Sequence, residues 1–245
     1  MEALGIDIGG SGIKGAPVDT ETGHLLTGRF RIPTPLPATP EAVIAVTAQV
    51  VQHFDWKGAI GCGFPAVVKA GQVFTAANVA SSWIGVRIED ELARTIGTPV
   101  RVINDADAAG LAEMRWGAGR NRGGVVLIVT LGTGIGSALF VDGKLVPNTE
   151  FGHIEIRGKE AEDRAAESVR ERKQLSWKRW AKRVDEYLDM MERLVWPDLI
   201  IIGGGVSADA EKFVPLLSSR AEIVPAQLLN NAGIAGAALA ALGQV

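Results

Sequence analysis

The chain has 245 residues, of which 47% are hydrophobic and 22% charged, and its formal net charge is -3 at pH 7. This composition excludes a largely disordered chain, and the acidic balance argues against a general nucleic-acid-binding protein. The single cysteine, Cys62, excludes an intramolecular disulfide and a cysteine-rich zinc site. No secretory signal follows Met1, and glycines and hydroxyl residues interrupt the longest uncharged stretch, so we expect a cytoplasmic protein without a membrane span.

The first part of the chain alternates apolar runs with turn residues. This pattern predicts strands over residues 4–8, 13–18, 30–32, 59–64 and 100–103. We expect one helix to begin at Pro40, a second to cover 89–96 before Gly97, and a third to begin at Asn104-Asp105.

The second part of the chain resembles the first in one respect. An apolar run at 125–131, the turn Gly132-Thr133-Gly134-Ile135 and a strand at 138–141 repeat the pattern around Gly10-Ser11-Gly12-Ile13. This similarity predicts two related lobes, each with a hairpin turn that faces phosphate. The remaining pattern predicts a helical, basic region at 159–193, a strand at 199–202, a helix at 209–217, a strand at 223–224 and a helix at 230–242. The expected apolar face of the basic region comprises Leu175, Trp177, Trp180, Val184, Tyr187, Leu188 and Met191. Strands that alternate with helices indicate the α/β class.

Three glycine-rich turns are candidate phosphate sites. Glycine lets backbone N–H groups approach an anion closely, and the first turn adds a lysine as well as an aspartate that suits water-coordinated Mg²⁺. The candidate residues are Asp7, Gly9, Gly10, Ser11 and Lys14 in the first turn, Gly132, Thr133 and Gly134 in the second, and Gly204 and Gly205 in the third. Ordinary hairpin or strand-to-helix turns are the alternative. A strand pattern after the first two turns disfavours a dinucleotide site.

Polar residues at two further places suit a sugar substrate. Asp105 follows a buried strand, where it can accept a proton from a hydroxyl group or simply cap the next helix. Glu150, His153 and Glu162 can hold vicinal sugar hydroxyls, and a zinc site or a surface turn is the alternative. The basic stretch from Arg164 to Arg183 predicts either a solvated helix face or a strip for a long polyanion.

The ordered set of these features resembles the ROK family of sugar kinases and repressors over essentially the whole chain. The resemblance rests on Asp7-Ile8-Gly9-Gly10, Asn78, Asn104-Asp105, Leu131-Gly132-Thr133-Gly134, Glu150-Phe151-Gly152-His153 and the late triple glycine. Three segments are similar to the polyphosphate glucokinases of that family: residues 171–177, 196–198 and 225–233.

The resemblance implies an actin-like, ribonuclease H-like pair of α/β domains with the active site in the cleft between them. We expect a smaller domain over 1–110, with the terminal helix 232–245 packed on it, and a larger one over 111–231. Because the first strand begins at about Ala3, we expect no DNA-binding domain before it.

The resemblance also implies the chemistry. Asp105 would deprotonate the 6-hydroxyl of glucose, and the sugar would be held by Asn78, Asn104, Glu150, His153 and Glu162. The turns would bind donor phosphates with Mg²⁺, which Asp7 would hold through water. Inorganic polyphosphate, ATP or both would be the donor, glucose or mannose the acceptor, and a homodimer the assembly, without nucleic acid, membrane or zinc. An ATP-only hexose kinase and a non-catalytic sugar-binding or regulatory module are the alternatives.

Overall fold

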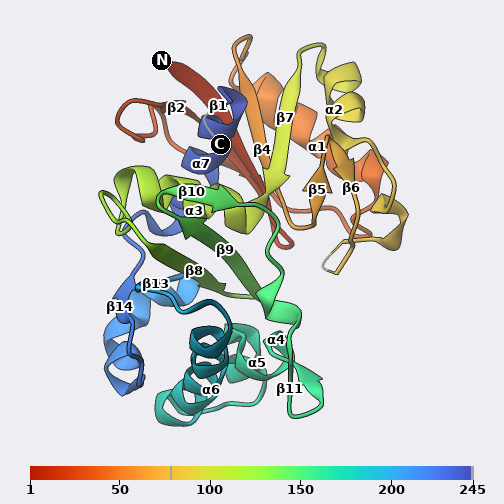
Figure 1. Ribbon diagram of the computed structural model, residues 1–245. Coiled ribbons are helices and arrows are strands. Elements are labelled where there is room, and N and C mark those ends of the chain that lie inside the picture. The colour runs from red at the N-terminus through yellow and green to blue at the C-terminus, as the bar shows by residue number, and fades with distance from the viewer. Residues whose placement is uncertain (78, 244–245) are drawn as a thin grey trace. The chain divides into compact units, whose positions relative to one another are not determined.

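The computed structural model describes residues 1–77 and 79–243 and divides the chain into two compact units (Figure 1). Unit 1 comprises Met1–Ala112 and the C-terminal residues from Asn231 onward, and unit 2 comprises Glu113–Asn230. Each unit is built on a mixed sheet with helices, which confirms the predicted α/β class. Among the described residues, no helix has the length and apolar character needed to cross a membrane.

The sheet of unit 1 has the strand order β3-β2-β1-β4-β7. It is antiparallel across β1, β2 and β3 and parallel from β1 through β4 to β7. Its strands are β1 (Glu2–Ile8), β2 (Ile13–Asp19), β3 (Phe30–Ile32), β4 (Ile60–Phe64) and β7 (Val100–Asn104). The other elements are α1 (Pro40–His53), β5 (Val68–Lys69), β6 (Gln72–Val73), η1 (Ser81–Trp83), α2 (Ile88–Ile96), α3 (Asp105–Trp116) and α7 (Ala232–Ala241).

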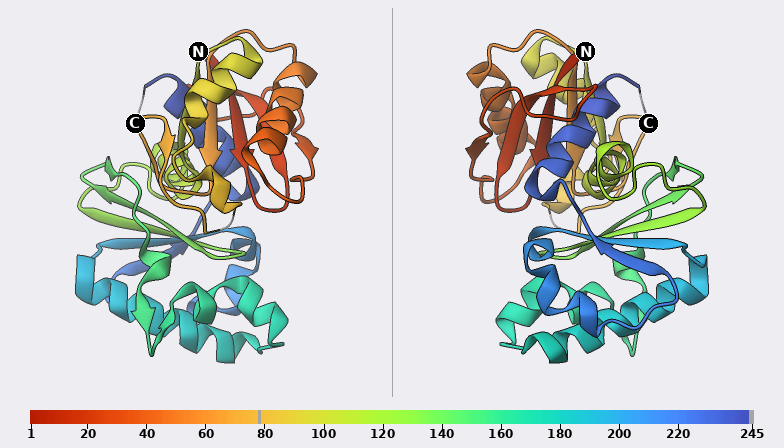
Figure 2. Two further views of the ribbon diagram at one scale, coloured as in Figure 1. Left: turned by 90° about the vertical axis from the view of Figure 1, so that its right-hand side faces the viewer. Right: turned by 90° about the vertical axis from the view of Figure 1, so that its left-hand side faces the viewer.

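Both faces of this sheet are covered. Residues 3–6 of β1 are all buried, although their side chains alternate between the two faces. Figure 2 shows α1 on one face of the sheet and α7 on the other. The small side chains of α7 bring this helix close to β1 and β4. The sequence predicted α7, and its burial explains why it is apolar on all sides.

The sheet of unit 2 has the strand order β10-β9-β8-β13-β14. Its strands are β8 (Val125–Leu131), β9 (Ile135–Val141), β10 (Lys144–Val146), β13 (Leu199–Gly203) and β14 (Glu222–Pro225). The other elements are η2 (Phe151–His153), β11 (Glu155–Ile156), β12 (Lys159–Glu160), α4 (Glu162–Ala165), α5 (Glu167–Arg172), α6 (Trp177–Val195), η3 (Gly205–Lys212), η4 (Val214–Leu216) and η5 (Leu229–Asn231).

Helix α6 supplies much of the core of unit 2. Its apolar residues recur at helical spacing, and the predicted face is confirmed by five side chains with no solvent exposure: Trp180, Val184, Tyr187, Leu188 and Met191. The indole N–H of Trp180 donates to the carbonyl of Ala165 at 2.9 Å, which fastens α6 to the end of α4. Figure 2 shows the helices α4, α5 and α6 gathered on one side of the sheet of unit 2.

Two helical predictions in unit 2 are wrong in detail. The expected helical region 159–193 begins with strand β12 and then divides into α4, α5 and α6, because Ala166 is extended and Gln174 has a positive φ. The expected helix 209–217 consists of the 3₁₀ segments η3 and η4. Asp209 and Phe213 have non-helical dihedrals, and Pro215 lacks the N–H that a longer helix needs.

Candidate active site

The first glycine turn joins β1 to β2 in unit 1. Asp7 and Lys14 are direct partners in this antiparallel pair, and their side chains form an ion pair of 3.0 Å. The sequence predicted Lys14 as a phosphate ligand and Asp7 as a Mg²⁺ ligand without a contact between them. The ion pair couples the two side chains, so Lys14 neutralises part of the carboxylate charge beside the turn.

Two residues that were not among the predicted site residues support this turn. The Arg31 guanidinium donates to the carbonyl of Ser11 at 2.6 Å, and the Thr34 hydroxyl donates to the carbonyl of Gly9 at 2.5 Å. The turn itself is closed by Gly9, whose N–H donates to the carbonyl of Gly12 at 3.1 Å. Arg31 lies opposite Lys14 in the β2–β3 register. Alternation along the predicted third strand was the signal that could have found it.

Asn104 and Asp105 lie where β7 ends and α3 begins. The side-chain oxygen of Asn104 accepts from the N–H groups of Ala106 at 2.8 Å and Asp107 at 3.1 Å, which makes Asn104 the N-cap of α3. The Asn104 amide also donates to the carbonyl of Ala66 at 3.3 Å. The Asp105 carboxylate also accepts the N–H of Ala106 at 2.8 Å, so Asn104 is the main cap of α3 and Asp105 contributes to it. Asp105 is the first residue of the helix, and it is half-buried.

The second glycine turn joins β8 to β9 in unit 2. Gly132 donates its N–H to the carbonyl of Gly134 at 3.0 Å. Ser168, near the start of α5, donates its N–H to the carbonyl of Gly132 at 3.0 Å and its hydroxyl to the carbonyl of Thr133 at 2.7 Å. Ser168 thus holds two carbonyls of the turn and fixes its conformation. The local sequence of the turn could not predict this, because Ser168 is distant in the chain.

The third glycine turn packs directly on the second. Gly204 has a φ of +85°, and a Cβ at this position would overlap the backbone of Leu131, so only glycine fits. A Cβ on Gly205 would lie 3.8 Å from the Glu167 carboxylate, which shows how near α5 lies. The turns at Gly132–Gly134 and Gly204–Gly205 and the start of α5 thus converge within unit 2.

The segment from Glu150 to His153 is anchored to β9. The buried Ser137 donates its hydroxyl to the carbonyl of Thr149 at 2.8 Å and accepts from the N–H of Phe151 at 3.1 Å. A Cβ on Gly152 would overlap the carbonyl of Ile135, so glycine permits this close approach. The segment therefore presents Glu150 and His153 from a rigid turn.

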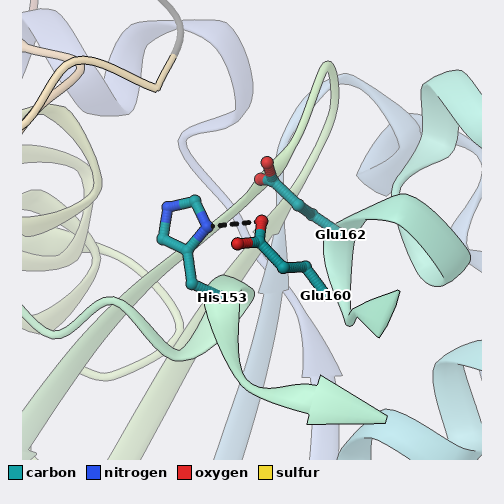
Figure 3. Close-up of side chains that lie close together, drawn as sticks. All are labelled: His153, Glu160 and Glu162. Carbon is teal, nitrogen blue, oxygen red and sulfur yellow. Dashed lines mark hydrogen bonds and ion pairs between the residues drawn. The ribbon is translucent and has the colours of Figure 1, made fainter. Parts of the chain in front are cut away.

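Three carboxylates surround the imidazole of His153. Its Nδ1 lies 2.9 Å from Glu160 Oε2 and its Nε2 lies 3.4 Å from Glu150 Oε2. Figure 3 shows the side chains of Glu160, at the end of β12, and Glu162, at the start of α4, both directed toward this imidazole. Glu162 also accepts the N–H of Ile135 at 3.2 Å, which ties this group to the second glycine turn.

The charges of this group perturb one another. Burial raises the pKa of the Glu150 carboxyl, and the Glu162 charge acts in the same direction, while His153 opposes both. Burial acts to lower the pKa of His153, but its hydrogen bond to Glu160 and the charges of Glu162, Glu160 and Glu150 raise it above its ordinary value. The group therefore combines carboxylate acceptors with an imidazole that readily carries a proton, which suits a polyhydroxylated ligand.

Glu160 was missed because a two-residue strand has no pattern of its own. His153, Glu160 and Glu162 bring one ligand atom each within 4.8 Å of one another, a spacing that could hold a metal ion. A zinc site was the alternative left open for Glu150, His153 and Glu162, but the sequence did not mark Glu160 as a member of this group. Asn78, the other predicted sugar contact, lies outside the described residues.

Comparisons with known proteins agree with one another. Residues 3–165 match the model of the ROK family. The chain is 54% identical to a polyphosphate glucokinase of Mycobacterium tuberculosis over 240 residues, covering 98% of this chain and 91% of that protein.

Two solved structures are similar over nearly the whole chain. An inorganic polyphosphate/ATP-glucomannokinase from Arthrobacter sp. strain KM matches with a TM-score of 0.96 and 49% identity, covering 100% of this chain and 99% of the other. A ROK family glucokinase from Streptomyces griseus, in complex with glucose and AMPPNP, matches with a TM-score of 0.85 and 26% identity, covering 97% and 98%.

Proposed function

Because this chain belongs to the ROK family, we propose that it transfers a phosphoryl group from inorganic polyphosphate or ATP to the 6-hydroxyl of glucose. The observation that carries the proposal is the 54% identity to a polyphosphate glucokinase over 98% of the chain. The similarity to a glucomannokinase supports mannose as a second candidate acceptor. A homodimer stays a prediction from the family resemblance.

Asp105 is the general base in this account. Phosphoryl transfer to a sugar needs a group that accepts the hydroxyl proton as the oxygen attacks, and a carboxylate performs that step well. Asn104 accepts two N–H groups at the start of α3 and Asp105 accepts that of Ala106 through one oxygen, so the cap of α3 does not depend on Asp105 alone. The half-buried position limits competition by water and holds the carboxylate on a rigid element.

The His153 group recognises the sugar. Glu150 and Glu162 accept hydrogen bonds from hydroxyls, and His153 donates one while Glu160 holds its ring. A carboxylate can accept from two neighbouring hydroxyls at once, so this arrangement favours a hexose with vicinal equatorial groups. Asn104 uses its oxygen for the cap, so its contribution to the sugar is limited to its amide N–H groups.

The glycine turns hold the donor. In unit 2 the residues are Gly132, Thr133, Gly134, Gly204 and Gly205, and in unit 1 they are Gly9, Gly10, Ser11 and the paired Lys14. Backbone N–H groups in such turns bind phosphate oxygens. Asp7 fits water-mediated binding of Mg²⁺, because a single carboxylate supplemented by phosphates and water is the usual way in which proteins hold this ion. When bound, Mg²⁺ neutralises phosphate charge.

The test is the Asp105→Asn substitution. The amide is nearly isosteric but cannot accept the proton, so we expect turnover to fall by about 10²-fold or more while glucose affinity, measured by calorimetry, changes little. Asp55→Asn, at an exposed side chain, is the matched control and should keep full activity. Substantial turnover by the Asp105 variant would refute its role. Glucose binding without turnover by the wild-type protein would favour the sugar-binding module.

A further inference from the structure

One segment of unit 2 has a charge unlike that of the rest of the chain. Residues 172–183 include no aspartate or glutamate, although the whole chain carries a net charge of -3. The segment contains six cationic residues: Arg172, Lys173, Lys178, Arg179, Lys182 and Arg183. We call residues 172–183 the basic segment. It covers the end of α5, the following turn and the first part of α6.

These cations are not neutralised within the described part of the chain. No carboxylate of residues 1–77 or 79–243 forms an ion pair with any of the six. All are exposed except Arg183, which is half-buried and donates to the carbonyl of Arg164 at 3.2 Å. At the other end of α6, by contrast, Arg193 pairs with Asp189 at 2.9 Å.

The charge pattern works against the stability of α6. The first turn of a helix favours acidic residues because the N-terminus carries a partial positive charge. Helix α2 follows this preference, whereas α6 has no acidic residue in its first turn and places Lys178 and Arg179 there. Lys178 with Lys182 and Arg179 with Arg183 are also like-charged neighbours at spacing i, i+4, which is unfavourable. An anionic ligand would relieve both effects.

The basic segment begins one helical turn from the proposed donor site. Ser168 holds the Gly132–Gly134 turn through its N–H and hydroxyl, and Arg172 follows it on α5 at about 6 Å along the axis. The corner between α5 and α6 is well packed. Arg170 stacks over the Trp177 ring at 4.0 Å, and Trp177 stacks on Phe213 with ring centroids 5.9 Å apart.

We propose that the basic segment binds the internal phosphates of a long inorganic polyphosphate chain whose terminal phosphate lies at the Gly132–Gly134 turn. This inference rests on the proposed function and adds to it a preference for long donors. Each phosphate of such a chain carries a negative charge. The cations can therefore contact successive phosphates, which are all identical. We expect ATP and tripolyphosphate, which carry only three phosphates, to reach at most the start of the segment and to gain little from it.

The test is the triple variant Lys178→Gln/Lys182→Gln/Arg179→Gln. We expect its KM for long-chain polyphosphate to rise about tenfold, since three exposed charge contacts are lost, with kcat and the KM values for tripolyphosphate and ATP unchanged. The control is Arg120→Gln/Lys144→Gln/Arg193→Gln, which removes the same charge from exposed positions of unit 2 outside the segment. It should behave like the wild-type protein. Thermal melting establishes that both variants are folded, and Lys178→Gln/Lys182→Gln alone provides a milder change.

The outcomes separate the two proposals. A KM for long-chain polyphosphate that stays unchanged, or that rises equally for tripolyphosphate, would overturn the inference and leave the proposed function intact. Wild-type protein that uses ATP but no polyphosphate would instead refute polyphosphate as donor. Single-stranded RNA that binds the wild-type protein but not the triple variant, with polyphosphate use unaffected, would assign the segment to nucleic acid and overturn the inference.

Discussion

Glu113 should be a major stabilising residue of unit 2. This carboxylate is 1% exposed and accepts backbone N–H groups from Ala118 at 2.9 Å, Gln227 at 3.1 Å and Leu228 at 2.7 Å. It therefore joins the end of α3 to the segment that leads out of unit 2. Glu113→Ala removes the acceptor of all three groups at once.

The magnitude follows from these three bonds. Leaving a buried donor without an acceptor costs about 1–3 kcal/mol, and water can reach the exposed residue Gln227, so we expect a loss of about 3 kcal/mol. In a chain of this size each kcal/mol lowers Tm by about 2–4 °C, which gives a decrease of about 6–12 °C. Glu113→Gln keeps one carbonyl oxygen and should lose about half as much.

Differential scanning calorimetry of the full chain measures this effect. Glu211→Ala, at an exposed glutamate of the same unit, is the control and should melt like the wild-type protein. A Glu113→Ala variant whose Tm falls by less than about 2 °C would refute the reasoning, because it would mean that the three N–H groups find other partners at little cost.

Two further predictions concern titratable side chains. Glu160→Gln should lower the pKa of His153, since the hydrogen bond and the charge of Glu160 raise it. An NMR titration of the imidazole measures this change, and an unaltered pKa of His153 would contradict the contact between the two side chains. Because the folded-state pKa of His153 is raised, its contribution to stability is present in full below the unfolded-state pKa and is lost as pH rises through the folded-state pKa. The Cys62 thiol is fully buried, and its pKa is raised by burial and by the Glu89 charge. A thiol reagent at pH 8 should therefore label Cys62 only after unfolding. Rapid labelling of the native protein would contradict this burial.

The sequence was most informative where a local pattern repeats. Apolar runs bounded by glycine and proline predicted the strands of both sheets except β10, and the spacing of Trp180, Val184 and Met191 predicted the buried face of α6. The comparisons confirm the α/β, actin-like fold class and the ROK family. These two predictions succeeded because the ordered turns that suggested them extend over most of the chain. The proposed domain boundaries and the catalytic and binding roles of individual residues stay predictions.

The sequence was least informative about contacts set by register and by short elements. The ion pair between Lys14 and Asp7 was not predicted, because it depends on the β1–β2 register. Ser168 and Glu160 come from a six-residue helix and a two-residue strand, so no periodicity marked either of them. Their partners lie 35 and 7 residues away, at Thr133 and His153, and only the folded chain shows these pairs.

The proposed kinase activity can be tested by measuring the formation of glucose 6-phosphate. The purified chain is mixed with glucose and Mg²⁺, and product is compared with long-chain polyphosphate and with ATP as the donor, using a coupled dehydrogenase assay. We expect rapid product formation with polyphosphate and loss of product when Mg²⁺ is chelated. Absence of glucose 6-phosphate with either donor would refute the proposed activity.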